Sequence, residues 1–113
     1  MPGNGTGQCI TVYFGAADRW QHQPLSMALL EMLRREGCSG ATVTRGVASF
    51  GAGSRIKTAT LVDLAGDLPM VLTVVETPER VAHLLPKISE MVEGGLITVD
   101  EVAIYQGSSR CED

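Results

Sequence analysis

The chain has few aromatic residues, few cysteines and no long apolar run. Only five of its 113 residues are aromatic, so a mainly aliphatic core is expected. The three cysteines (Cys9, Cys38 and Cys111) are odd in number and widely spaced, which favours reduced thiols in a cytoplasmic protein over a disulfide framework or a zinc site. No apolar run approaches the ~18–20 residues that span a bilayer. Residues 1–7 have neither the positive nor the apolar region of a signal peptide.

Residue sets for metal binding, nucleic-acid binding and catalysis are also missing. His22 and His83 have no second ligand at metal spacing, so no metal is predicted. The net charge of −4 and the lack of a basic helix argue against nucleic acid as a partner. An acylphosphatase-like hydrolase would need an arginine in a phosphate loop and a residue that positions water. Arg19 lies in the corresponding loop, but no asparagine accompanies it. No Cys–His or Ser–His–Asp set can be assembled, so a non-catalytic protein is favoured.

Acidic residues are absent from one long segment, between Glu36 and Asp63. This segment predicts two strands, at residues 41–47 and 58–62, joined by the glycine-rich loop Phe50-Gly51-Ala52-Gly53-Ser54-Arg55. Its basic residues are Arg45, Arg55 and Lys57. Basic side chains beside glycines, whose backbone N–H groups a ligand can approach closely, are typical of a site for a small anion, often a phosphate. The alternative is an ordinary solvated hairpin loop that binds nothing.

The hydrophobic pattern outside this segment predicts alternating strands and helices. Strands are expected at residues 8–14 and 70–75. Helices are expected from Pro24 to Gly37 and from Thr77 to Gly94-Gly95, the second with a kink at Pro86. A last extended segment covers residues 96–105, with a bulge or break expected at residues 100–101. In the loop at residues 15–23, Trp20 is expected to cover the edge of the core rather than stack on a ligand.

With the hairpin strand at residues 58–62 set aside, this order is β-α-β-β-α-β. It predicts the α+β ferredoxin-like fold, in which a four-stranded antiparallel sheet carries both helices on one face. We expect one domain at residues 8–106, a disordered leader at residues 1–7 and a flexible tail at residues 107–113. The strand at residues 70–75 is apolar on nearly both faces, so it points apolar side chains away from the helices in either orientation: Met70, Leu72 and Val74, or Val71 and Val75. An uncovered apolar sheet face marks an interface, which predicts a homo-oligomer.

Several short motifs, in the same order along the chain, carry a family resemblance. They are Tyr13-Phe-Gly15 with Asp18-Arg19, Pro24-Leu25, Gly40-Ala-Thr-Val-Thr-Arg-Gly46, Phe50-Gly51, Ser54-Arg55-Ile56, Thr58-Ala59, Asp67-Leu68-Pro69, Leu85-Pro86 and Gly95-Leu96-Ile-Thr98. In these motifs the chain resembles, over residues 9–106, the PII-like branch of bacterial proteins, which is related in fold to the PII signalling proteins. The resemblance implies a ferredoxin-like trimer, with sheets lining the centre and clefts between neighbouring subunits.

In PII proteins those clefts bind adenine nucleotides, and the loop between the second and third strands contacts a target such as a transporter or an enzyme. The resemblance therefore implies an adenine nucleotide as ligand and a signalling role for residues 50–57, although this loop is much shorter than the target loop of PII proteins. The turn Gly94-Gly95-Leu96 matches the phosphate loop by position but lacks its usual basic residue. Phosphate charge would then be met by Arg45, Arg55 or Lys57, with Arg110 a weaker candidate. The candidate ligand-binding residues are Arg45, Gly46, Phe50, Gly51, Gly53, Ser54, Arg55, Lys57, Gly94 and Gly95.

Two questions stay open at the level of the sequence. Arg45 shares a strand face with Val43 and Val47, so it either pairs with a carboxylate, such as Asp63, Glu76 or one of a neighbouring subunit, or points at an anion in the cleft. The favoured function is a non-catalytic regulator that binds a small anionic ligand. The alternative is an oligomeric protein-interaction module, such as a transporter accessory, with no nucleotide ligand.

Overall fold

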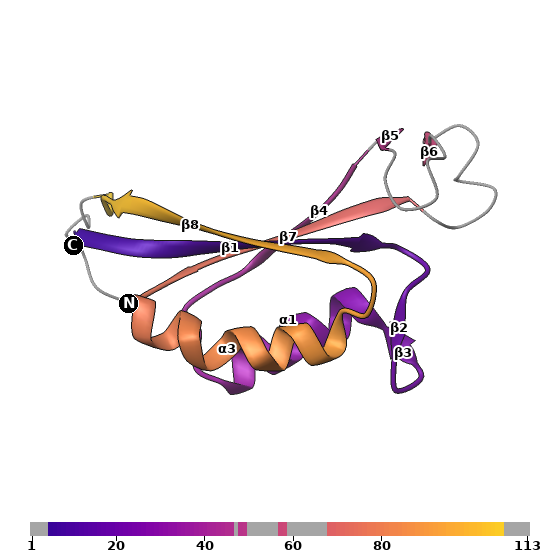
Figure 1. The fold of residues 1–113 in the computed structure, drawn as a ribbon, viewed down its shortest axis with the longest axis horizontal. Helices are drawn as coiled ribbons and strands as arrows, with labels where there is room; N and C mark the ends of the chain where they lie inside the picture. The colour runs from indigo at the N-terminus through magenta and orange to yellow at the C-terminus, as the bar shows by residue number, and fades with distance from the viewer. Residues whose placement is uncertain (1–4, 47, 50–56, 59–67, 108–113) are drawn as a thin grey trace, which may run out of the picture.

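The computed structural model describes residues 5–46, 48–49, 57–58 and 68–107. Its main sheet is antiparallel and has four strands in the order β4-β7-β1-β8. These strands are β4 (Thr42–Arg45), β7 (Pro69–Glu76), β1 (Gly5–Gly15) and β8 (Leu96–Ile104). The helices α1 (Leu25–Arg35) and α3 (Pro78–Met91) lie on one face of this sheet (Figure 1). The predicted ferredoxin-like β-α-β-β-α-β fold is therefore confirmed.

The core lies between the two helices and the inner face of the sheet. In β1, Ile10, Val12 and Phe14 point inward and are almost fully buried, as the alternation in the sequence predicts. The helices contribute Leu25, Ala28, Leu29, Met32 and Leu33 from α1, and Val81, Leu84, Ile88 and Met91 from α3. Both sets follow the helical spacing of their apolar residues. Trp20 packs half-buried against the edge of this core, as expected.

The ends of both helices follow the expected chemistry. The hydroxyl of Thr77 accepts a hydrogen bond from the backbone N–H of Arg80 at 3.4 Å, which makes Thr77 the N-cap of α3. Gly37 follows α1 with a φ of +88°, a left-handed conformation that glycine adopts without steric cost. Gly94 follows α3 in the same way, with a φ of +79°. α3 continues through Pro86 as one helix.

Three segments differ from the sequence prediction. β1 begins at Gly5 rather than at Gln8, so residues 5–7 belong to the sheet instead of the leader. β8 pairs with β1 without interruption, and the break expected at residues 100–101 is wrong. Residues 15–23 are more than a loop, because β2 (Arg19–Trp20) and β3 (Gln23–Pro24) pair with each other there.

The β2–β3 hairpin turns through Gln21 and His22, which have φ values of 50° and 72°. A two-residue turn with both residues left-handed usually contains Asn-Gly or a similar pair, so the sequence did not reveal it. Arg19 Nη2 donates a hydrogen bond to the carbonyl oxygen of His22 at 2.7 Å and closes the turn. Long-range packing of Trp20 on the core also holds this hairpin in place.

The predicted central hairpin is divided between two sheets. Residues 42–45 form β4 in the main sheet, whereas β5 (Ala48–Ser49) and β6 (Lys57–Thr58) pair only with each other among the described strands. The loop at residues 50–55 and the expected strand beyond Thr58 lie outside the described residues. So do residues 1–4 of the expected leader and residues 108–113 of the expected tail.

The face of the sheet opposite the helices, which we call the open face, is uncovered by the described part of the single chain (Figure 1). Leu72 and Val74 of β7 are buried under the helices, so Val71 and Val75 point to the open face. Strand register places Tyr13 and Leu96 side by side on this face, where their side chains are 43% and 58% exposed.

Candidate functional site

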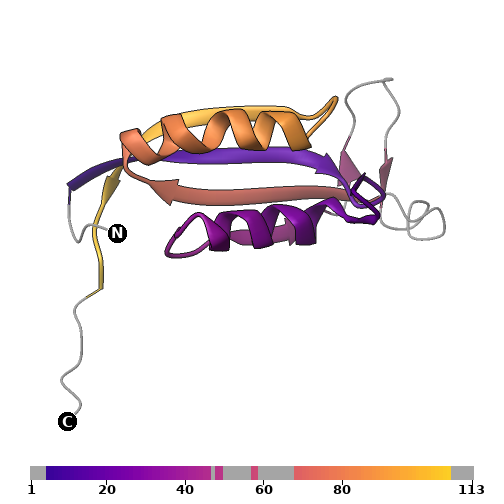
Figure 2. The same ribbon diagram turned by 90° about the horizontal axis from the view of Figure 1, so that it is seen from below.

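The two halves of the sequence-predicted site lie at the same end of the main sheet. The register pairs Arg45 with Met70, Gly15 with Pro69, and Tyr13 with Leu96. The end of β4, the start of β7, the end of β1 and the start of β8 therefore meet at one end, where β5 and β6 also lie (Figures 1 and 2). We call this the hairpin end of the sheet.

Arg45 is the last residue of β4, and its side chain is exposed. Within the described part of the chain it forms no ion pair. The expected pairing of Arg45 with Glu76 is wrong, because Glu76 lies at the other end of β7. Glu76 pairs instead with Arg80, and its Oε1 lies 3.2 Å from Arg80 Nε. The other expected partner, Asp63, lies outside the described residues. No described carboxylate thus competes with an anion for the Arg45 guanidinium at the hairpin end.

Gly46 anchors the end of β4 against β7. Its backbone N–H donates a hydrogen bond to the carbonyl oxygen of Pro69 at 2.8 Å. A Cβ at this position would lie 3.0 Å from Pro69 Cγ, so the Gly46 backbone lies closer to the proline ring than a larger residue permits comfortably. This contact holds the neighbouring Arg45 at a defined place on the edge of the sheet.

Gly94 and Gly95 form the turn between α3 and β8. A Cβ on Gly95 would lie 2.7 Å from the carbonyl oxygen of Tyr13 and would also meet Val92, so only glycine fits against the end of β1. Gly94, by contrast, has open space around it and needs glycine for its positive φ. The turn therefore exposes backbone without side chains, as a loop that approaches a phosphate must do.

Within one chain, Arg45 and the Gly94-Gly95 turn lie toward opposite edges of the hairpin end. Arg45 ends the edge strand β4, and the turn leads into the other edge strand, β8, with β7 and β1 between the two. Neighbouring strands are ~4.8 Å apart, so three spacings separate the two edges by roughly 14 Å. A ligand that contacts both groups must be long or must lie between two copies of the chain.

The remaining candidate residues belong to the hairpin. Lys57 lies in β6 and pairs with Ser49 of β5, at the hairpin end. The other five candidates lie outside the described residues: Phe50, Gly51, Gly53, Ser54 and Arg55. The structure thus places Arg45 and Gly46 at one edge of the hairpin end, Lys57 in the separate small hairpin, and the glycine turn toward the other edge.

Sequence reasoning missed a charged cluster at the opposite end of the sheet. Glu76 is 2% exposed and is the buried charged residue of the described chain. It pairs with Arg80, but helical spacing does not signal this pair, because Glu76 ends a strand and Arg80 lies in the helix that follows. Nearby, Glu36 Oε1 lies 3.0 Å from His83 Nε2, and Glu36 Oε2 lies 3.5 Å from Lys87 Nζ.

The pKa values in this cluster follow from its contacts. The hydrogen bond with His83 holds the pKa of the Glu36 carboxyl below its ordinary value of 4.5. Burial opposes this effect, and the positive charge of Lys87 lowers the pKa further. Burial raises the pKa of the Cys38 thiol, so this cysteine is a neutral thiol rather than a reactive thiolate. Cys9, on the open face, is also a free thiol.

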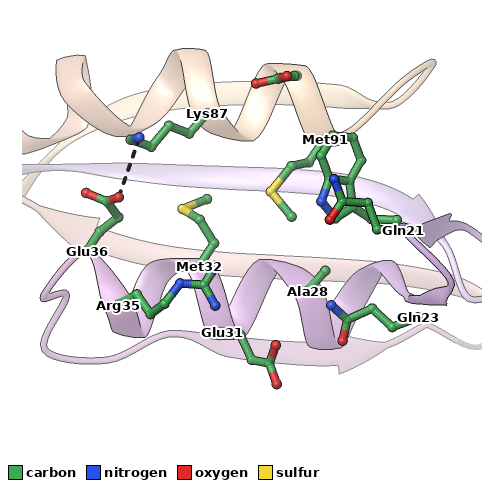
Figure 3. A pocket seen from close by; sticks show the side chains of 11 residues that line it. Gln21, Gln23, Ala28, Glu31, Met32, Arg35, Glu36, Lys87 and Met91 are labelled. Atoms are coloured by element: carbon green, nitrogen blue, oxygen red, sulfur yellow. Dashed lines mark ion pairs between the residues drawn. The ribbon is translucent and has the colours of Figure 1, made fainter.

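A groove of about 370 Å³ runs between α1 and α3 (Figure 3). Met32 and Met91 point toward each other across it, and the Lys87–Glu36 ion pair bridges the two helices. Its lining mixes acidic, basic, amide and apolar side chains. No group of three His, Cys, Asp or Glu side chains in the described residues is arranged to hold a metal ion. None of the helices described here has the length and apolar character that crossing a membrane requires.

The four-stranded sheet with two helices on one face is a fold that the chain shares with PII-like proteins. A PII-like signalling protein of Thermus thermophilus (TTHA0516) superposes with a TM-score of 0.66 at 20% identity, over 92% of this chain and 94% of that one. CPII, a nitrogen regulatory PII-like protein from Thiomonas intermedia K12 whose structure holds ADP, AMP and bicarbonate, also gives a TM-score of 0.66, at 16% identity over 91% and 92% of the two chains.

Sequence comparison gives the family. The profile of the DUF190 family, described as "Uncharacterized ACR, COG1993", matches residues 7–104, and the chain belongs to this family. The UPF0166 protein MJ1524 of Methanocaldococcus jannaschii is 27% identical over 101 residues, which are 88% of this chain and 93% of that protein. A UPF0166 protein of Aquifex aeolicus is 27% identical over 95 residues, 84% of this chain and 90% of that protein. The predicted resemblance to the PII-like proteins is confirmed at the level of the fold.

Proposed function

We propose that the chain is a non-catalytic, PII-like regulatory protein that assembles as a trimer in the cytoplasm. It binds a small anionic ligand, an adenine nucleotide, in clefts between subunits and signals to a target protein through residues 50–57. Arg45, the Gly46 backbone and the hairpin provide one side of each cleft. The Gly94-Gly95 turn of the neighbouring subunit provides the other.

The open face supports the assembly. Burying an exposed apolar side chain contributes ~1.5–3 kcal/mol, and Val71, Val75, Tyr13 and Leu96 all lie on this uncovered face. The helices of the same chain already cover the opposite face (Figure 1). In the proposed trimer, the second and third copies of the chain cover this open face.

The position of the site residues supports a cleft between subunits, and this observation carries the proposal. A cyclic assembly uses two different surfaces of each subunit, so the β4 edge of one copy can meet the β8 edge of the next. The Arg45 of one copy would then lie beside the glycine turn of its neighbour, although the two are roughly 14 Å apart in one chain. The positive charge of Arg45 and the exposed backbone of the glycine turn would together suit a phosphate.

The choice of an adenine nucleotide rests on the PII-like fold. CPII, which shares this fold at 16% identity, is bound to ADP, AMP and bicarbonate. At this identity the likeness supports a class of ligand and not a set of conserved contacts. The acid-free segment between Glu36 and Asp63, with its three basic residues, agrees with an anionic ligand of this class.

The test combines thermal unfolding with sedimentation. ATP, ADP, AMP and cyclic dinucleotides are added in turn, and a ligand at about 100 times its Kd stabilises the folded protein by about 2.7 kcal/mol. We expect one nucleotide to raise Tm and the protein to sediment as a trimer at micromolar concentration. Arg45→Gln should abolish the rise. Arg34→Gln, which removes the same charge from the exposed end of α1, should leave it unchanged.

Two results would overturn parts of this proposal. A compact monomer at micromolar concentration removes the cleft and with it the ligand site. A trimer whose Tm responds to no nucleotide contradicts nucleotide binding and favours the alternative function, a protein-interaction module or transporter accessory.

A further inference from the structure

The buried carboxylate Glu76, at the end of β7, has no part in the proposed ligand site. Its side chain is 3% exposed and both of its oxygens are used. Oε1 pairs with Arg80 Nε at 3.2 Å, and Oε2 accepts a hydrogen bond from the backbone N–H of Ser39, also at 3.2 Å. Ser39 lies in the connection between α1 and β4, so Glu76 reaches across from the middle of the sheet to the segment that leads into its edge strand.

Arg80 extends this contact along the same connection. Its Nη2 donates a hydrogen bond to the carbonyl oxygen of Glu36 and lies 3.9 Å from Cys38 Sγ. Glu76 and Arg80, which we call the tether, thus hold three residues of the connection: Glu36, Cys38 and Ser39. The tether takes one member from β7 and one from the first turns of α3.

β4 is otherwise held by its pairing with β7 and by Val43, which packs partly buried against the core. It is an edge strand of four residues, and among the described strands β7 is its only neighbour in the main sheet. Short edge strands open more readily than central ones because hydrogen bonds hold them on one side alone. The tether fixes the chain just before β4, and the hydrogen bond of Gly46 to Pro69 fixes it just after. Arg45 lies between these two anchors.

We infer that Glu76 and Arg80 are positioning residues, which fix β4 on β7 and thereby place Arg45 for its ligand. The inference about Arg45 rests on the proposed function, whereas the inference about β4 does not. Glu76 is buried, whereas the Arg80 side chain is 39% exposed, and an ion pair of this kind is weak support for stability. Apolar side chains, however, cannot hold the Ser39 N–H or the Glu36 carbonyl. We therefore assign to the tether a role in positioning β4 rather than a role in stabilising the folded protein.

The experiment replaces the tether by apolar side chains in the full chain, as the double variant Glu76→Leu/Arg80→Leu. We expect thermal stability close to that of the parent. Amide exchange of residues 42–45 should become at least about tenfold faster, as the loss of a hydrogen bond to a charged group permits. The concentration of ADP that gives half of the Tm rise should increase by about tenfold for the same reason.

The matched control is Lys87→Met, which removes the exposed ion pair with Glu36 and leaves the tether intact. It should change neither amide exchange in β4 nor the response to ADP. If the double variant does not fold, Arg80→Lys replaces it, because lysine keeps the charge beside Glu76 but loses the fork that reaches the Glu36 carbonyl. Faster exchange at residues 42–45 is again expected, by a smaller factor.

The two proposals fail in different ways. Unchanged amide exchange at residues 42–45 in a folded tether variant overturns the inference, whatever ADP does. Faster exchange in β4, together with a parent protein that does not respond to ADP or to the other nucleotides, supports the tether and overturns the proposed nucleotide binding. Faster exchange with an undiminished ADP response shows that Arg45 does not depend on the tether, and it overturns that half of the inference.

Discussion

Replacing Gly95 by alanine is the sharpest test of the glycine turn at the hairpin end. The added methyl group would lie 2.7 Å from the carbonyl oxygen of Tyr13 and would also meet the side chain of Val92. The oxygen belongs to β1, a strand paired on both sides, so it cannot move away without disturbing the sheet. Overpacking of this kind costs typically about 1–3 kcal/mol.

Two other glycines supply matched controls. Gly94→Ala meets open space but must keep a φ of +79°, which costs an L-residue roughly 1–2 kcal/mol. Gly40→Ala also meets open space, and its φ is not positive, so it should cost little or even stabilise. Gly95→Ala should lower the free energy of unfolding at least as much as Gly94→Ala does. Gly40→Ala should lower it much less than either.

Urea unfolding followed by the fluorescence of Trp20, the single tryptophan, measures these free energies. Trp20 packs half-buried against the core, so its fluorescence changes when the core unfolds. Protein concentration is held constant because subunit assembly shifts apparent stability. If Gly95→Ala unfolds at the same urea concentration as Gly40→Ala, the close approach of the turn to β1 is refuted, and with it the described geometry of this part of the site.

Three further predictions concern the core, a helix cap and acid stability. Leu29→Ala, in the buried face of α1, should cost ~2–5 kcal/mol, whereas Met27→Ala, at a side chain 49% exposed, should cost less than about 1 kcal/mol. Thr77→Ala should cost about 1 kcal/mol through loss of the N-cap of α3. Because the pKa of Glu36 is lowered on folding, its carboxylate stabilises the protein above pH 4.5, and this contribution is lost as pH falls through the lower folded pKa. The unfolding free energy of Glu36→Gln should therefore depend less on pH below 4.5 than that of the parent.

Each of these has an outcome that would contradict it. Equal urea midpoints for Leu29→Ala and Met27→Ala would place residue 29 outside the core. A Thr77→Ala variant as stable as the parent, with Thr77→Ser as its control, would mean that the cap contributes nothing. Parallel pH profiles for Glu36→Gln and the parent between about pH 5 and about pH 3 would show that the contact with His83 does not stabilise the carboxylate.

The sequence predicted the parts of the structure that depend on near neighbours in the chain. The apolar spacing of Leu25 to Leu33 gives α1 its buried face, and alternation around Val12 gives β1 its inner side. Glycine at position 37 and threonine at position 77 mark helix ends where the structure has them. These features follow from side-chain spacing and backbone preference within a few residues, so no tertiary information was needed.

Long-range pairing decided what the sequence left open or indicated wrongly. The β2–β3 hairpin lacks the usual turn residues and depends on the packing of Trp20. β8 runs straight through the expected break because Asp100 and Glu101 find partners in β1. Arg45 does not pair with Glu76, because the register places them at opposite ends of β7.

The amino-acid sequence by itself determined the order of elements, the side of each helix that is buried and the residue types of the candidate site. Only the tertiary structure decided that Arg45 and the Gly94-Gly95 turn stand on opposite edges of one end of the sheet, and that the buried Glu76 faces the segment entering β4. The reason is physical. Local preferences act over one or two turns of chain, whereas strand order and register arise from contacts between residues such as Ser39 and Glu76, which are 37 positions apart.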